Sequence, residues 1–241
     1  MPVLDNHAIA GSTYGFSATR LGDLGASEYT LVALAADVSG SVSPFLDQIE
    51  LCVQRIARTC RRSPRADNLL LRVVQFGTDL AEVHGFKPLP EIDPDDYVGA
   101  LACRGTTALY DAAHNAVESV TRYGKSLTDN DFSVNGIVFV VTDGHDCAST
   151  ETARSVGEAL TRAVRSEALE SLVTVLVGVD VQSKATARAL ADFARDAGFT
   201  GFVQLEKAGE DTLAQLAAFV TRSIALQSTA LGSGHAVTLT F

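Results

Sequence analysis

Residues 29–56 read YTLVALAADVSGSVSPFLDQIELCVQRI, and the hydrophobic pattern changes in the middle of this stretch. Residues 29–37 form a nearly continuous apolar run, which is typical of a strand buried on both faces of a parallel sheet. After a Ser-Gly-Ser turn, Pro44 opens a segment in which apolar residues recur at helical spacing. A buried strand followed directly by an amphipathic helix is the repeating unit of a doubly wound α/β sheet.

The same unit recurs toward the C-terminus. Three further strands are predicted from apolar runs, at residues 136–142 (GIVFVVT), 172–179 (LVTVLVGV) and, more weakly, 199–205. Helical spacing follows each of them, at residues 151–167, 184–194 and 212–226. Another helix is expected from Thr107 to about Tyr123. Residues 69–76 and 81–86 flank a Gly-Thr-Asp turn and predict a β-hairpin, which would place one antiparallel edge strand on a mostly parallel sheet.

These patterns predict one Rossmann-like α/β domain at residues 28–227. With 241 residues, 46% of them hydrophobic, the chain is long enough for one well-buried core and short for two. Residues 1–27 form an N-terminal extension with turn residues and scattered apolar positions. Residues 228–241 form a C-terminal tail in which AVTLTF alternates like a short strand. We expect these ends to pair with each other or with an edge of the sheet.

Composition excludes several classes of partner and site. The net charge is -10 and no Lys/Arg stripe is interleaved with aromatic residues, so we expect no nucleic acid partner. The apolar runs are far shorter than the roughly 20 residues of a membrane helix, and no signal-peptide pattern opens the chain, so a cytoplasmic location is expected. Four cysteines lack CxxC spacing, which argues against a zinc cluster and favours small buried residues, with a regulatory disulfide at Cys103 and Cys147 as the alternative for that pair.

Oxygen-bearing side chains gather at the ends of the predicted strands. Strand 29–37 ends in Asp37-Val-Ser39-Gly-Ser41, strand 136–142 is followed by Asp143, and Gly-Thr-Thr107 precedes a helix. Open α/β sheets bind ligands at the carboxyl ends of their strands, so these three loops are expected to converge. Two carboxylates and three hydroxyls suit a hard cation, Mg²⁺ or else Mn²⁺ or Ca²⁺. They leave at least one coordination position open.

The segments DVSGS, GTTALYDA and VVTDG, in this order, resemble the metal-ion-dependent adhesion site (MIDAS) of von Willebrand factor A domains. The resemblance spans roughly residues 29–225 and implies that Asp37, Ser39, Ser41, Thr107 and Asp143 bind the ion. It also implies that an acidic residue of a partner protein completes the coordination. Thr106 stands where the family often has glycine, so Thr106 remains an alternative to Thr107.

The resemblance implies a binding function rather than catalysis. The chain looks most like prokaryotic intracellular members, which act as adaptors and are often encoded with AAA+ ATPases, kinases or phosphatases. The alternatives are a metal-dependent hydrolase or phosphatase, and a subunit that binds metal only for stability. An aspartyl phosphatase would need an acid where Ser39 stands, and neither a P-loop nor a GxSxG elbow occurs. His145 and Asp146 are expected at the rim of the site. Asp111 and His114 are expected as solvated or partly packed helix positions, and the alternative is that they support the ion ligands from behind.

Overall fold

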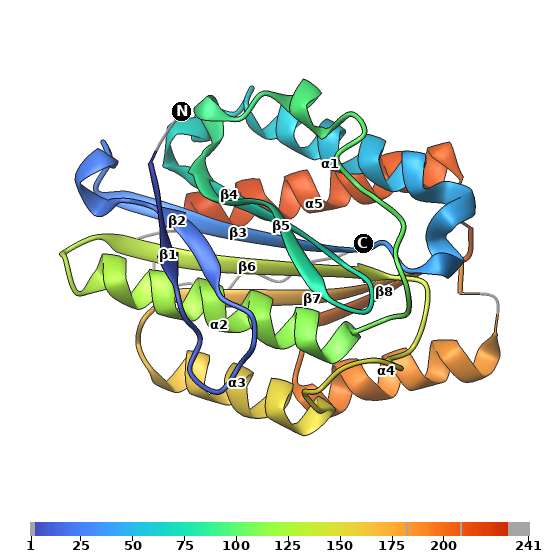
Figure 1. Cartoon of the computed structure of the whole chain (residues 1–241). Helices are drawn as coiled ribbons and strands as arrows, with labels where there is room; N and C mark the ends of the chain where they lie inside the picture. Colours follow the sequence, from blue (N-terminus) through green and yellow to red (C-terminus); the bar gives the residue numbers. More distant parts are fainter. Residues whose placement is uncertain (1–2, 182, 208, 231–241) are drawn as a thin grey trace.

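The computed structural model describes residues 3–181, 183–207 and 209–230. Within them, eight strands form one sheet, with helices on both of its faces (Figure 1). The strands are β1 (Leu4–His7), β2 (Phe16–Thr19), β3 (Glu28–Asp37), β4 (Leu69–Phe76), β5 (Leu80–Pro88), β6 (Ser133–Thr142), β7 (Ser171–Val179) and β8 (Gly201–Leu205). The α-helices are α1 (Leu46–Cys60), α2 (Leu109–Thr128), α3 (Ala153–Arg165), α4 (Lys184–Ala197) and α5 (Glu210–Ala230).

The centre of the sheet is parallel and buried on both faces. The strand order is β1-β2-β5-β4-β3-β6-β7-β8, and β4, β3, β6, β7 and β8 all run the same way. One hydrophobic cluster packs α1 and α5 on one face, and a second packs α2, α3 and α4 on the other (Figure 1). The predicted doubly wound, mostly parallel α/β fold is therefore confirmed. The apolar runs lack alternation because both faces of these strands are covered.

The N-terminal extension is part of the sheet. β5 is antiparallel to β4, as predicted, but it is not the outermost strand. β2 pairs in parallel with β5, and β1 pairs antiparallel with β2. These two strands have four residues each, too few for a periodicity that distinguishes strand from turn. The strand expected in the C-terminal tail falls on residues 231–241, which lie outside the described residues.

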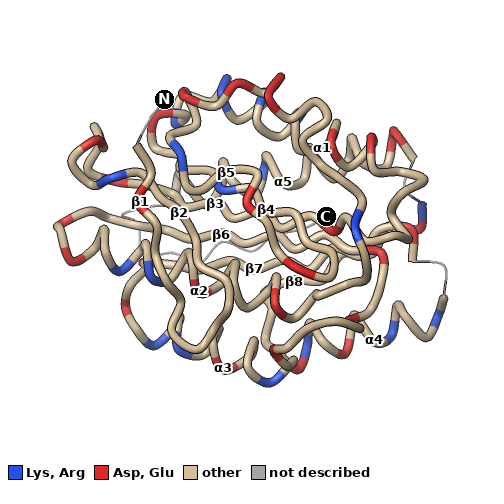
Figure 2. Tube along the Cα trace, viewed as in Figure 1, with Lys and Arg blue, Asp and Glu red and all other residues tan. Residues whose placement is uncertain are grey.

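β3 and β6 are neighbours in the middle of the sheet, and later strands are added in opposite directions from this point: β4 beside β3, and β7 beside β6. The segment after β3 leads to α1 on one face, whereas the segment after β6 leads to α3 on the opposite face. In α/β sheets ligands bind outside the carboxyl ends of the strands at such a point, and we call this region of the protein the crevice. Figure 2 shows that acidic and basic residues lie mostly on the surrounding helices and loops. No helix in the described part of the chain is long and apolar enough to cross a membrane.

Candidate metal centre

Asp37 is the last residue of β3, and its side chain is fully buried. The backbone N–H of Ser39 donates to Asp37 Oδ1 at 2.8 Å, and the hydroxyl of Thr142 donates to Asp37 Oδ2 at 2.6 Å. Thr142 is the last residue of β6, the strand that pairs with β3. The carboxylate is therefore held in one orientation by donors from two neighbouring strand ends.

Ser39 and Ser41 connect this carboxylate to the third predicted loop. Their hydroxyl oxygens lie 3.2 Å apart, at the start of a short 3-10 helix over Gly40–Phe45. The hydroxyl of Ser41 donates to Asp143 Oδ1 at 2.9 Å, across 102 positions of sequence. Asp143 directly follows β6. The first and third loops therefore meet as the sequence predicts, with the Ser41 hydroxyl within hydrogen-bond distance of both Ser39 Oγ and Asp143 Oδ1.

The loop before α2 is attached to the first loop through its backbone. The Arg104 N–H donates to the Val38 carbonyl at 2.6 Å, and the Gly40 N–H donates to the Gly105 carbonyl at 3.0 Å. Gly105 has a φ of 61°, and a Cβ there would lie 2.0 Å from Thr78 Oγ1. Only glycine fits this turn, which brings the chain back toward the crevice.

The two candidate threonines of this loop face different ways. Thr106 is exposed, and its hydroxyl lies 3.1 Å from Thr78 Oγ1 in the turn of the β4–β5 hairpin. Thr107 is buried, and a Cβ built on Gly144 would lie 3.8 Å from Thr107 Oγ1. Thr107 therefore approaches the loop that carries Asp143, and Thr106 does not. All five residues predicted as ion ligands belong to this one crevice.

The start of α2 leaves the Thr107 hydroxyl free of a capping role. Thr107 precedes the helix, which begins at Leu109 with Ala108 as its N-cap residue, and no side chain at the N-cap accepts a hydrogen bond. Residues of the loop after β6 supply acceptors instead. The Tyr110 N–H donates to Asp146 Oδ1 at 3.2 Å, and the Asp111 N–H donates to Ser149 Oγ at 3.0 Å. These acceptors satisfy backbone donors that every helix start exposes.

This contact corrects the expectation for Asp146. Its half-buried carboxylate binds the first turn of α2 and accepts a hydrogen bond from the Ser149 hydroxyl. It therefore fixes the loop and does not line an open rim. His145 is exposed, in keeping with the position expected for it beside Asp143.

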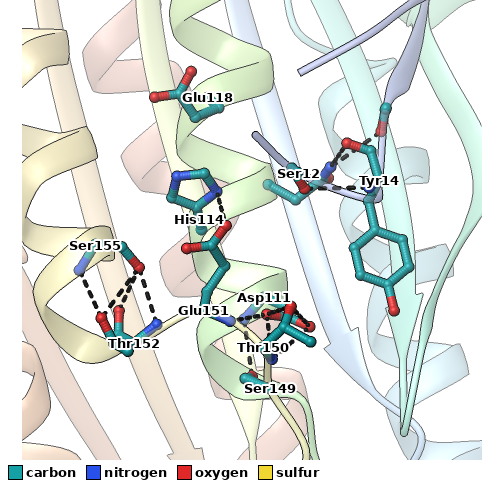
Figure 3. Close-up of polar contacts among 12 residues, drawn as sticks. Ser12, Tyr14, Asp111, His114, Glu118, Ser149, Thr150, Glu151, Thr152 and Ser155 are labelled. Atoms are coloured by element: carbon teal, nitrogen blue, oxygen red, sulfur yellow. Dashed lines mark hydrogen bonds and ion pairs between the residues drawn. The ribbon is translucent and has the colours of Figure 1, made fainter. Parts of the chain in front are cut away.

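Asp111 anchors the far end of the same loop (Figure 3). Its side chain is only 3% exposed, and it accepts hydrogen bonds from the backbone N–H groups of Thr150 at 3.0 Å and Glu151 at 2.7 Å. The interpretation of Asp111 as a solvated or partly packed helix position was therefore wrong. His114, one turn further along α2, is also buried, with Nδ1 3.6 Å from Glu151 Oε1.

Burial disfavours the charged form of both candidate carboxylates. It raises the pKa of Asp37 to about 6, although hydrogen bonds from Thr142 and Ser39 act in the opposite direction. It also raises the pKa of Asp143, and the negative charge of nearby Asp180 adds to this effect. A cation beside these groups would favour their ionised forms.

The donor set fits a hard cation. Among the described residues, no group of three or more His, Cys, Asp or Glu side chains is placed to hold a metal ion. The candidate centre therefore depends on hydroxyl oxygens together with two carboxylates, which is ligand chemistry suited to Mg²⁺, Mn²⁺ or Ca²⁺.

Comparisons with known proteins identify the fold and no family. No family profile and no curated protein matches the chain. The PilB minor pilin from Streptococcus sanguinis superposes with a TM-score of 0.59 and 13% identity, over 86% of this chain and 64% of the pilin. The pilus adhesin SpaC from Lactobacillus rhamnosus GG superposes with a TM-score of 0.57 and 11% identity, over 82% of this chain and 30% of SpaC.

Proximal thread matrix protein 1 from the mussel byssus, solved with a zinc-occupied MIDAS motif, gives a TM-score of 0.50 and 17% identity. The match covers 84% of this chain and 46% of that protein. The chain thus spans less than two thirds of each of these three proteins. At such identities the similarity establishes a shared fold.

Sequence reasoning missed two residues that support the crevice, Thr142 and Ser149, and favoured a solvated or partly packed position for a third, Asp111. Thr142 orients Asp37, while Asp111 and Ser149 attach the loop after β6 to α2. A signal for Thr142 was present, because a hydroxyl at the end of β6 is adjacent to the end of β3 in a parallel pair. Asp111 and Ser149 are brought together by the packing of α2 against that loop, which no local pattern reports.

Proposed function

We propose that this chain is a von Willebrand factor A-like domain that binds a partner protein through a divalent cation, and that it is not an enzyme. The cation would be Mg²⁺, or else Mn²⁺ or Ca²⁺, held by Asp37, Ser39, Ser41, Thr107 and Asp143. The observation that carries the proposal is the hydrogen-bonded row from Ser39 through Ser41 to Asp143, which joins two distant loops through ligand-type oxygen atoms. When bound, the cation would supply positive charge and an open coordination position for a carboxylate of the partner.

The protein residues have separate tasks in this proposal. Asp37 is buried and is oriented by Thr142, whereas Asp143 is half-buried. Both carboxylates would provide negative charge to the cation. The hydroxyls of Ser39, Ser41 and Thr107 provide neutral oxygen ligands, so the total ligand charge stays low and the coordination shell remains incomplete. A partner carboxylate can then add to the site without displacing a protein ligand.

The charge of the whole chain favours a specific contact of this kind. With a net charge of -10, the protein repels an acidic partner at long range, and more strongly at low salt. Local cation charge at the crevice would offset this repulsion only for a partner that presents a carboxylate there. In this proposal the chain acts as an adaptor beside an ATPase, kinase or phosphatase.

A titration of the purified chain tests the ion site. Calorimetry with Mg²⁺, Mn²⁺ and Ca²⁺ should give one site per chain, and Zn²⁺ belongs in the panel because a structural neighbour holds it. Thr107→Val keeps the side-chain shape and removes one ligand oxygen, so the dissociation constant should rise about tenfold or more. Thr106→Val is the matched control and should bind as the wild type does. Equal affinities in the wild type and Thr107→Val would contradict the ligand assignment.

A second experiment tests the partner. Proteins retained by the immobilised chain in Mg²⁺ and released by EDTA should be identified, purified and measured by surface plasmon resonance. Binding should require the cation and one partner carboxylate, and should be lost on a single Glu→Gln or Asp→Asn change in the partner. Equal affinity in Mg²⁺ and EDTA would rule out this mechanism. Metal-dependent turnover of a phosphoester by the chain alone would support the hydrolase alternative instead.

A further inference from the structure

The four cysteines fall into two classes. Cys52 and Cys60 are buried residues of α1, and burial raises the pKa of their thiols to about 12 and about 11. Cys103 and Cys147 are exposed and carry free thiols, contrary to the expectation that all four cysteines pack in the interior. The thiolate is the reactive form of cysteine, and a reagent must be able to reach it. Reactions of thiols with reagents in solution are therefore expected at Cys103 and Cys147.

Both exposed thiols contact the backbone of a candidate ion ligand. The Cys103 S–H donates to the Ser39 carbonyl at 3.3 Å, and the Thr107 N–H donates to Cys147 Sγ at 3.4 Å. The Cys147 N–H also donates to the Thr107 carbonyl at 3.0 Å. The N–H and the carbonyl of Thr107 are therefore both bonded to one cysteine. Two exposed thiols on different loops thus converge on the same crevice, and each is coupled to a different ligand.

We propose that Cys103 and Cys147 form a modification site for low-molecular-weight disulfides of the glutathione type, and that an adduct there weakens cation binding. The effect on the cation rests on the proposed function, whereas the reactivity of the thiols does not. In the exchange, the cysteine thiolate attacks one sulfur of the disulfide, and a new S–S bond forms as the old one breaks. The released thiolate takes up the proton that the cysteine lost. The cysteine is oxidised and the leaving half of the disulfide is reduced.

Each adduct changes a contact of the crevice. A mixed disulfide at Cys103 has no S–H, so the Ser39 carbonyl loses its donor. An adduct at Cys147 adds a bulky group beside the backbone of Thr107, in the loop that also carries Asp143. Disturbing groups that orient metal ligands typically reduces affinity about 10- to 100-fold, and we expect at least a tenfold rise in the dissociation constant for Mn²⁺.

The experiment treats the folded protein with oxidised glutathione and maps adducts by peptide mass spectrometry. Mn²⁺ affinity is then measured by calorimetry before treatment, after treatment and after reduction with excess thiol. Adducts should form at Cys103 and Cys147, spare Cys52 and Cys60, and lower the affinity reversibly. Each variant is compared with itself before and after treatment. Cys103→Ser/Cys147→Ser should lose the response, and Cys52→Ala, which retains both exposed thiols, should keep it.

Three results would overturn the proposal. Absence of adducts in the folded protein, or equal modification of all four cysteines, would show that the exposed pair is not a distinct site. Adducts that leave the Mn²⁺ affinity unchanged would remove the link to the crevice. Failure of untreated protein to bind any cation would overturn the proposed function and that link together, while the adduct map would still report on the thiols.

Discussion

At the scale of single residues, the carboxylate of Asp37 that the proposed metal binding requires is unfavourable for the stability of the metal-free fold. Its ordinary pKa is 3.8, and burial raises the pKa to about 6. The folded state therefore favours the protonated acid. This stabilising contribution is fully present below about pH 4 and is lost as the pH rises through about 6. Ionised Asp37 then reduces the free energy of unfolding by roughly 3 kcal/mol at neutral pH.

Asp37→Asn should reverse this cost while removing the ion site. The amide that replaces the carboxylate cannot ionise, and the Thr142 hydroxyl can turn to the Gly144 carbonyl, which lies 3.1 Å away. In EDTA, urea unfolding should show the variant to be more stable than the wild type by roughly 3 kcal/mol at pH 7.5 and nearly equal at pH 4. Divalent cations should stabilise only the wild type. A variant that is less stable than the wild type in EDTA at pH 7.5 would show that the charge of Asp37 is well solvated.

At the scale of elements, α2 and the loop after β6 form one unit. The helix start takes its acceptors from Asp146 and Ser149, and the Asp111 carboxylate in turn receives the N–H groups of residues 150 and 151. This reciprocal bonding links the loop that carries Asp143 to the helix that follows Thr107.

Asp111→Asn tests that unit. Both backbone N–H groups bond Asp111 Oδ1, and a neutral amide oxygen accepts them more weakly than a carboxylate does, so the free energy of unfolding should fall by about 1 kcal/mol or more. Mn²⁺ affinity measured by calorimetry should fall as well, although Asp111 is not proposed as a ligand. Asp129→Asn, at the exposed end of the same helix, removes only a surface ion pair with Lys125 and should change neither quantity appreciably. Equal effects of the two substitutions would contradict the role assigned to Asp111.

At the scale of the whole molecule, one buried guanidinium joins the N-terminal strands to the core. Arg72 of β4 is 1% exposed and pairs with Glu82 of β5 at 2.6 Å. Glu82 also accepts hydrogen bonds from the N–H and the hydroxyl of Ser17 in β2. Burial lowers the pKa of Arg72, while Glu82 acts in the opposite direction. Glu82 therefore holds β2 in place and also neutralises the buried charge of Arg72.

Glu82→Gln should reduce the free energy of unfolding by about 3 kcal/mol, because it leaves the Arg72 guanidinium buried without a counter-ion. Urea unfolding followed by circular dichroism measures this change. In the ion pair between Asp5 and Arg20, about half of each side chain is exposed. Asp5→Asn breaks this pair and should change the free energy of unfolding by less than about 0.5 kcal/mol. A loss in Glu82→Gln no larger than that in Asp5→Asn would mean that water replaces the counter-ion.

The sequence predicts the fold because its decisive strands are apolar on both faces. Residues 29–37 and 136–142 leave little choice but a covered parallel sheet, and the three loops at the crevice follow from that topology. The sequence predicts that the N-terminal segment can pair with an edge of the sheet, as β2 does with β5, but it does not locate the two strands, since LDNH at residues 4–7 has no apolar face. The resemblance favours Thr107 over Thr106 as the ligand, but the contact between Thr106 and Thr78 could not be predicted, because it depends on a hairpin turn 28 residues earlier.

The place of β2 beside β5 also decides where the chain can be cut. A shortened protein that starts at residue 28 would match the strand–helix repeat, yet it would leave β5 as an uncovered edge with free N–H and C=O groups. Exposed edges of this kind recruit strands from other molecules and promote aggregation. With β1 and β2 in place, the sheet ends in a strand of four residues instead of the nine-residue β5, so we expect fragments that keep both strands to aggregate less.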